Sequence, residues 1–138
     1  MTIRPYRKTD EAALLALWQA SGLVKPQNDP RKDIARKLRV NPEWLLVGEN
    51  AGRIVAAVMA GYEGHRGWIN YLAVDPAHRR AGLGRAMMAA AERLLRAAGC
   101  PKINLQVRTS NRDVIAFYQR IGFAVDDVVS LGKRLAAD

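Results

Sequence analysis

The stretch HRRAGLGRAMM, from His78 to Met88, places three arginines and two glycines immediately before a run of Ala, Leu and Met with helical spacing. Glycine is a poor helix former, so Gly82 and Gly84 need another reason to stand here. Glycine lets the backbone approach a ligand closely, and the unpaired N–H groups and dipole of a helix start favour an anion. The stretch therefore predicts an anion-binding loop, with an ordinary surface loop as the alternative.

The residues around this stretch alternate between strand and helix patterns. Strand patterns occupy 3–6, 44–47, 54–59, 68–74, 103–108, 123–126 and 128–131. Helix patterns begin after Thr9, at Asp29-Pro30, at Leu83 and after Asn111. The expected order is β-α-α-β-β-β-α-β-α-β-β. Helices placed between strands predict an α/β or α+β fold, with a sheet of about six or seven strands flanked on both faces by about four helices.

Length and composition limit the class of protein. The 138 residues suit a single domain, 1–138, whose core needs no disulfide. Cys100 is the lone cysteine, and two histidines without a carboxylate or thiol cluster predict no metal site. No segment approaches the roughly 18 apolar residues of a membrane helix, and the charged N-terminus lacks the apolar run of a signal peptide. We expect a cytoplasmic protein with no membrane partner.

The net charge of +9 predicts an anionic partner without identifying it. Nucleic acid, a membrane surface, an acidic protein and a phosphorylated cofactor would all fit. Five basic residues surround the apolar face of the second helix, which carries Ile34 and Leu38: they are Arg31, Lys32, Arg36, Lys37 and Arg39. We interpret this basic cluster as a solvated face, with contact to an acidic acceptor or partner as the alternative.

Two sequence blocks resemble a known family, the GCN5-related N-acetyltransferases (GNAT). The first, Arg79-Arg80-Ala81-Gly82-Leu83-Gly84, matches the acyl-CoA signature Arg/Gln-x-x-Gly-x-Gly/Ala and follows the strand Tyr71-Leu72-Ala73-Val74. The second places Asn111, Ala116, Tyr118 and Gly122-Phe123 at the spacing of the family segment Asn-x4-Ala-x-Tyr-x3-Gly-Phe. Each block stands in its expected structural context. The stretches 62–67, 100–103 and 130–135 further resemble the small bacterial acetyltransferases of this family.

The resemblance implies the GNAT fold, with a mixed and mostly antiparallel sheet, and acetyl-CoA as co-substrate. It implies that the loop holds the pyrophosphate and that the pantetheine arm lies like an extra strand along 72–74. The cofactor-binding residues so implied are Leu72, Ala73, Val74, Arg79, Arg80, Ala81, Gly82, Leu83, Gly84, Arg85 and Asn111. The physical chemistry agrees, because convergent N–H groups at a helix start suit a pyrophosphate and larger side chains at 82 and 84 would block its approach.

Acetyl transfer needs a neutral amine, a polarised thioester carbonyl and a protonated leaving thiolate. The resemblance implies that the N–H of Leu72 or its neighbour polarises the carbonyl and that Tyr118 protonates the sulfur of CoA. Without the resemblance, the helical period would make Tyr118 a core residue, and Asn111 would be a helix cap.

One position departs from the family. In the branch that acetylates the N-terminal residue of a ribosomal protein, a glutamate base occupies the position of Gln106. Gln106 cannot take a proton, so that base and that acceptor are both in doubt. Glu63 and His65, in the loop before the central strand, are the candidate replacements, and an ordinary polar loop is the alternative.

The leading hypothesis is an N-acetyltransferase that moves an acetyl group from acetyl-CoA to a primary amine by direct transfer in a ternary complex, without a metal. The acceptor is a small molecule or a peptide, selected by 14–39 and 62–67, and the chain is a monomer or a homodimer. The alternative is a CoA- or acyl-CoA-binding sensor without acceptor chemistry. A nucleic-acid binder is suggested by charge alone and predicts steep salt dependence; we expect no nucleic-acid partner.

Overall fold

The computed structural model describes all of residues 1–138 and divides them into two compact units. The first unit contains residues 1–104 together with Asp138, and the second contains residues 105–137. The first unit carries nearly all of the sheet and three of the α-helices, and the second is built around the fourth helix.

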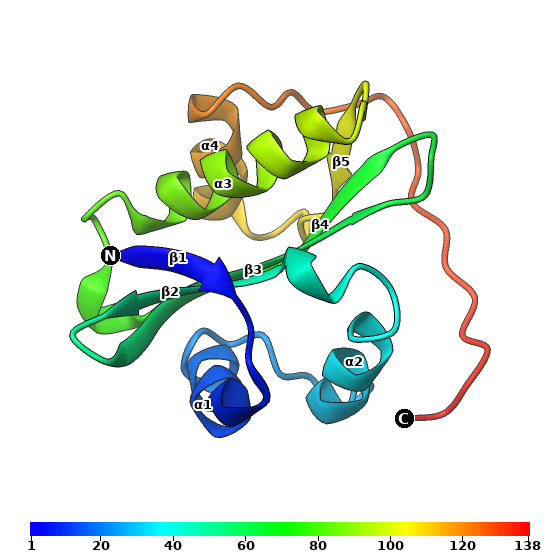
Figure 1. Ribbon diagram of the computed structural model, residues 1–138. Helices are drawn as coiled ribbons and strands as arrows, with labels where there is room; N and C mark the ends of the chain where they lie inside the picture. Colours follow the sequence, from blue (N-terminus) through cyan, green and yellow to red (C-terminus); the bar gives the residue numbers. More distant parts are fainter. The chain divides into compact units, whose positions relative to one another are not determined.

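The sheet has five strands in the order β1-β2-β3-β4-β5 (Figure 1). They are β1 (Thr2–Pro5), β2 (Leu45–Asn50), β3 (Arg53–Tyr62), β4 (Gly67–Val74) and β5 (Ile103–Leu105). The pairings from β1 through β4 are antiparallel. Ala51 and Gly52 both have positive φ, 51° and 78°, as a two-residue type I′ hairpin between β2 and β3 requires. The order predicted for these five strands along the chain is confirmed.

Helices cover both faces of the sheet, as the alternation in the sequence predicts (Figure 1). The helices α1 (Glu11–Ala20) and α2 (Pro30–Lys37) lie on one face, and α3 (Leu83–Ala97) lies on the other. The Asp29 carboxylate caps α2 by accepting a hydrogen bond of 2.9 Å from the N–H of Arg31. Gly99, with φ 84°, follows the end of α3.

The core on the α1 face forms from the apolar stripe that the sequence predicts for this helix. Leu14 and Trp18 are fully buried, and they pack against β2, β3 and β4. Burial of a large apolar side chain stabilises the fold by about 1.5–3 kcal/mol. The segment from Val55 to Val58 is at most 1% exposed at every residue, so β3 is buried on both faces, as expected of a central strand.

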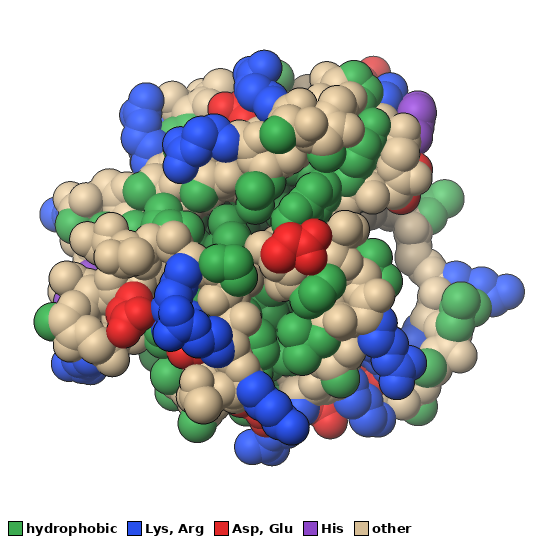
Figure 2. Space-filling view, in the orientation of Figure 1, with side chains coloured by type: hydrophobic (Ala, Val, Ile, Leu, Met, Phe, Trp, Pro, Cys, Tyr) green, Lys and Arg blue, Asp and Glu red, His purple; other side chains and the backbone are tan.

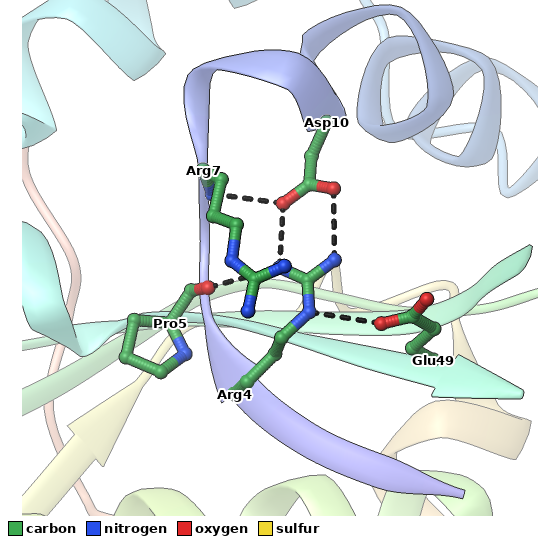
Figure 3. Close-up of polar contacts among 5 residues, drawn as sticks. All are labelled: Arg4, Pro5, Arg7, Asp10 and Glu49. Carbon is green, nitrogen blue, oxygen red and sulfur yellow. Dashed lines mark hydrogen bonds and ion pairs between the residues drawn. The ribbon is translucent and has the colours of Figure 1, made fainter. Parts of the chain in front are cut away.

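An ion-pair network joins β1 to the start of α1 and to β2 (Figure 3). The Arg4 guanidinium donates two hydrogen bonds to the Asp10 carboxylate, at 2.8 and 2.9 Å, and one to Glu49 at 2.9 Å. Asp10 also accepts a hydrogen bond of 2.8 Å from the N–H of Arg7. The bond from Arg4 holds the pKa of Asp10 below its ordinary value. Bidentate pairing of this kind fixes orientation as well as distance, so the network sets where α1 begins.

A bulge interrupts the pairing of β3 with β4. Two residues of β4, Tyr71 and Leu72, lie opposite the single residue Val58. Tyr71 has φ 53°, a left-handed conformation that bulky residues rarely adopt. One extra residue shifts the alternation of side chains along the strand, so that Asn70 and Tyr71 both line the same pocket. The ring of Tyr71 stacks on Trp18 of α1, with centroids 3.9 Å apart.

The second unit contains α4 (Arg112–Arg120), and its remaining residues form no strand beyond the end of β5. The strands predicted at 123–126 and 128–131 are absent, so that prediction was wrong, and β5 ends sooner than the predicted 103–108. Val128 and Val129 are 77% and 82% exposed. Branched side chains favour a strand only where a neighbouring strand completes the ladder, and none pairs with this segment. The α+β class and the four helices are confirmed, and the sheet has five strands where six or seven were predicted.

Candidate functional site

The turn at 79–85 leads directly into α3. Arg80 and Gly82 adopt the left-handed conformation, with φ 67° and 76°. For an arginine this conformation is strained, and strain of this kind clusters at functional sites. Gly82 is the N-cap residue of α3 and has no side chain with which to cap it. Arg79 and Arg85, on either side, are exposed.

The first N–H groups of α3 have no partner in the protein. The N–H of Ala86 bonds to the carbonyl of Gly82 at 3.0 Å, whereas those of Leu83, Gly84 and Arg85 make no backbone bond. The first turn carries no acidic residue and no capping side chain. No atom lies within 4 Å of the place where a Cβ on Gly82 would stand. Free donors, the positive end of the helix dipole and an open approach together suit an anion such as a pyrophosphate.

The outer edge of β4, which faces away from β3, presents main-chain groups at the end of the strand that leads into this turn. β5 has three residues against eight in β4, and it begins opposite Gly67, whose N–H bonds to the residue before β5 at 2.9 Å. The N–H of Asp75 bonds to β3 at 2.8 Å. By alternation, Ala73 directs its main chain toward β3, and Leu72 and Val74 direct theirs outward. This end of the edge therefore has hydrogen-bonding groups without a partner strand.

A pocket of about 450 Å³ lies on the α2 side of the bulge. Asp33 and Lys37 from α2 and Tyr71 from β4 are among the residues that line it. The Tyr71 hydroxyl donates a hydrogen bond of 2.5 Å to the Asp33 carboxylate. Burial, followed by this bond to Asp33, raises the pKa of Tyr71 well above its ordinary value. The hydroxyl therefore keeps its proton, and the bond holds α2 to the bulge.

Lys37 contradicts the solvated face that the sequence predicts for the basic cluster. It is 9% exposed, and its ammonium donates a hydrogen bond of 2.5 Å to the carbonyl of Ala60. Burial lowers the pKa of Lys37. The physical reason for its position is that Lys37 stands three residues after the buried Ile34, on the same face of the helix. Leu38, predicted to share the apolar face, is 39% exposed.

The structure places Glu63 and His65 in the hairpin turn between β3 and β4. The Glu63 carboxylate accepts a hydrogen bond from the N–H of Arg66 and lies 3.8 Å from Nδ1 of His65. The turn precedes Gly67, and Leu72 stands five positions after Gly67 in β4, about 16 Å away at the rise of a strand. The structure therefore does not bring Glu63 to the free edge at Leu72, and its carboxylate already closes the turn.

The second unit holds the other predicted site residues. Asn111 is the N-cap residue of α4, is exposed and makes no side-chain capping bond. Tyr118 is 8% exposed and contacts Phe117 and Phe123 edge to face, with ring centroids 5.1 and 5.5 Å away. Burial raises the pKa of Tyr118 to about 12, so this hydroxyl keeps its proton at neutral pH. The Gln106 amide donates to the hydroxyl of Ser130.

The polar groups of the pocket were not predicted from the sequence. Asp33 reads as one more charge on a polar helix, and Asn70 and Tyr71 read as ordinary strand residues. The bulge places two consecutive residues of β4 on one face. The strand pattern of the sequence does not reveal a bulge, so it could not have identified them. Lys37 carries a weak signal, its spacing of three from Ile34.

The surface charge singles out no one region of the visible face. Figure 2 shows Lys and Arg side chains at several separate places, with acidic and apolar side chains between them. No helix in the structure has the length and the apolar character needed to cross a membrane. The local chemistry of the turn, the β4 edge and the pocket is thus a better guide to function than the net charge.

Comparison with known proteins identifies a family whose name describes acetyl transfer. The model of the acetyltransferase (GNAT) family matches residues 11–123. Acetyltransferase YE1169 from Yersinia enterocolitica is 44% identical, and acetyltransferase ECA0875 from Pectobacterium atrosepticum is 45% identical, each over the whole chain and 98% of the relative. The crystal structure of Ard1 from Thermoplasma volcanium superposes with a TM-score of 0.77 at 27% identity, covering 91% of this chain and 83% of that one. The chain therefore belongs to the GNAT family and is an acetyltransferase.

Proposed function

We propose that the chain is one N-acetyltransferase domain that moves an acetyl group from acetyl-CoA directly to a primary amine. The observation that carries the proposal is the uncapped start of α3, where free N–H groups stand beside the open space at Gly82. The family match over 11–123 spans both compact units, which supports a single functional domain.

The residues of the first unit fit acetyl-CoA at two places. The free N–H groups of the turn and of α3 would hold the pyrophosphate, with Arg79, Arg80 and Arg85 supplying positive potential. The outward main chain of Leu72 and Val74 would bond to the amides of the pantetheine arm in the way that an added strand does. When bound, acetyl-CoA supplies the thioester whose acetyl group is transferred.

The chain's own groups have three tasks in the transfer. The N–H of Leu72 would polarise the carbonyl under attack. As the C–S bond breaks and the C–N bond forms, Tyr118 would give its proton to the departing sulfur, since its raised pKa keeps that proton in place until then. The proton of the amine leaves to a base or to water, and Glu63 as that base stays a prediction.

Direct transfer is supported by the position of the one cysteine. The Sγ of Cys100 lies beside Gly67, 2.8 Å from where a Cβ there would stand, and it bonds to the carbonyl of Lys102. Gly67 is at the start of β4, about 16 Å along the strand from Leu72. A covalent acetyl-cysteine is therefore not part of the proposal.

The test is a thiol-release assay with acetyl-CoA and a panel of small amines, polyamines, amino acids and short peptides. We expect release that depends on an added amine, with initial-rate patterns that intersect as a ternary complex requires. Binding of acetyl-CoA without release to any amine would reject the transfer and favour a CoA-sensing module. Parallel initial-rate lines would reject the direct route.

A further inference from the structure

We propose that Lys37 binds an anionic group of the acceptor, so that the preferred acceptors are amines that also carry a carboxylate or a phosphate. The proposal rests on the acetyl transfer proposed above and assigns the pocket beside the bulge to the acceptor. Lys37 lines this pocket while being 9% exposed as a residue. Each such acceptor carries both a primary amine and a group with anionic oxygens.

The Lys37 ammonium makes no ion pair in the protein, and the nearby charge of Glu43 only partly offsets the effect of burial on its pKa. Its hydrogen-bond partner is the neutral carbonyl of Ala60 at 2.5 Å, and an ammonium has three protons to donate. Asp33, one helical turn earlier, instead accepts hydrogen bonds from Tyr71 and Arg36. A buried cation without an anion is costly, as the lowered pKa of Lys37 also indicates. An anion entering the pocket would offset this cost.

The other cation of the pocket is already neutralised. Arg36 holds the carboxylate of Asp138 through two hydrogen bonds, at 2.9 and 3.1 Å, and lies 3.5 Å from the carboxylate of Asp33. These contacts show that this part of α2 accepts carboxylates. Of the two cations that line the pocket, Lys37 is therefore the one that makes no ion pair.

The pocket adjoins the free edge of β4. Tyr71 lines the pocket, and the next residue, Leu72, directs its main chain to the edge where the thioester is proposed to lie. A volume of about 450 Å³ has room for a molecule the size of an amino acid or a dipeptide. An acceptor held by its anion at Lys37 can thus extend its amine toward the bulge. Because lysine is a compact point charge, it does not by itself distinguish carboxylate from phosphate.

The experiment compares matched pairs of acceptors in the thiol-release assay. Glycylglycine is compared with glycylglycinamide, and O-phosphoethanolamine with ethanolamine, on wild type and three variants. Lys37→Met removes the charge and keeps the apolar stem, and Lys37→Arg keeps the charge. Lys32→Met is the matched control, because Lys32 is an exposed lysine on the same helix that does not line the pocket.

We expect wild type to prefer the anionic member of a pair by about tenfold to a hundredfold in kcat/KM, as a charge-assisted hydrogen bond allows. Lys37→Met should abolish the preference, and Lys37→Arg and Lys32→Met should keep most of it. The pair that responds tells whether carboxylate or phosphate is preferred. Equal turnover of both members, or a preference that survives Lys37→Met, would overturn the role of Lys37 while leaving acetyl transfer intact.

Calorimetric titration of the same probes separates the two proposals if no acceptor releases thiol. Wild type should bind glycylglycine or O-phosphoethanolamine, and Lys37→Met, first shown to be folded by its thermal transition, should not. That result would reject acetyl transfer to these probes and keep the anion site. Absence of binding to wild type, or equal binding to Lys37→Met, would reject the anion site itself.

Discussion

Replacing Gly82 with Ala tests the turn as the binding site for the cofactor. Gly82 has φ 76°, and no atom lies within 4 Å of a Cβ placed there. The methyl group therefore meets no protein atom, and its cost to the fold is the cost of a left-handed L-residue, about 1 kcal/mol. With an unfolding entropy of about 2.1 cal/mol/K per residue, this corresponds to a fall in Tm of about 3 °C for 138 residues.

The effect on acetyl-CoA should be larger than the effect on the fold. The added methyl group occupies the open space beside the free N–H groups of α3, so one or two hydrogen bonds to the pyrophosphate would be lost or lengthened. Bonds to a charged group contribute about 1.5–3 kcal/mol each. We expect the Kd for acetyl-CoA to rise at least tenfold.

Gly52→Ala is the matched control for this experiment. Gly52 has φ 78° and equally open surroundings, but it lies in the hairpin between β2 and β3. Both variants should lose about 3 °C in Tm by the same backbone argument, and calorimetric titration should show weakened acetyl-CoA binding for Gly82→Ala alone. If the two variants bind the cofactor equally well, the pyrophosphate does not lie in the space beside Gly82, and the assignment of the turn fails.

Three other substitutions test separate parts of the argument. Tyr118→Phe should lower kcat at least tenfold with an unchanged Kd for acetyl-CoA, because it removes the proton held by a pKa of about 12; unchanged turnover would remove the assigned role. Asp10→Asn should lower the free energy of unfolding in urea by about 2 kcal/mol at pH 7. Since the folded pKa of Asp10 is lowered, this contribution is present above its ordinary pKa and is lost as the pH falls through the folded value; a pH-independent difference would contradict the pairing. If Glu63 is the base, Glu63→Gln must lower kcat at least tenfold, and activity within about threefold of wild type would leave it a turn-closing residue.

Local signals in the sequence were sufficient to place the glycine-rich turn at the start of α3. Two glycines, three arginines and a long apolar helix lie within about twenty residues, and each acts through its own backbone or charge. The structure adds that Arg80 shares the left-handed conformation of Gly82, which no residue preference foretells for an arginine.

Features that depend on distant partners were not predictable in the same way. The residues at 123–131 have strand-forming side chains, but a strand needs a neighbour, and the sequence does not say whether one is in place. Lys37 reads as a surface residue because charge usually means exposure. Lys37 is buried because α2 places its side chain against β3, where the carbonyl of Ala60 accepts a hydrogen bond from the ammonium.

The bulge in β4 links the two halves of the proposed reaction. In a regular strand, Tyr71 would share a face with Gly67, which lies against Leu95 of α3. The extra residue instead turns Tyr71 toward α1, where its ring stacks on Trp18 and its hydroxyl bonds to Asp33. These contacts offset the strain of a positive φ in a bulky residue. The pairing with β3 shifts by one residue at this bulge, so one departure from regular pairing turns Tyr71 into the pocket proposed for the acceptor, next to the edge of β4 proposed for the thioester.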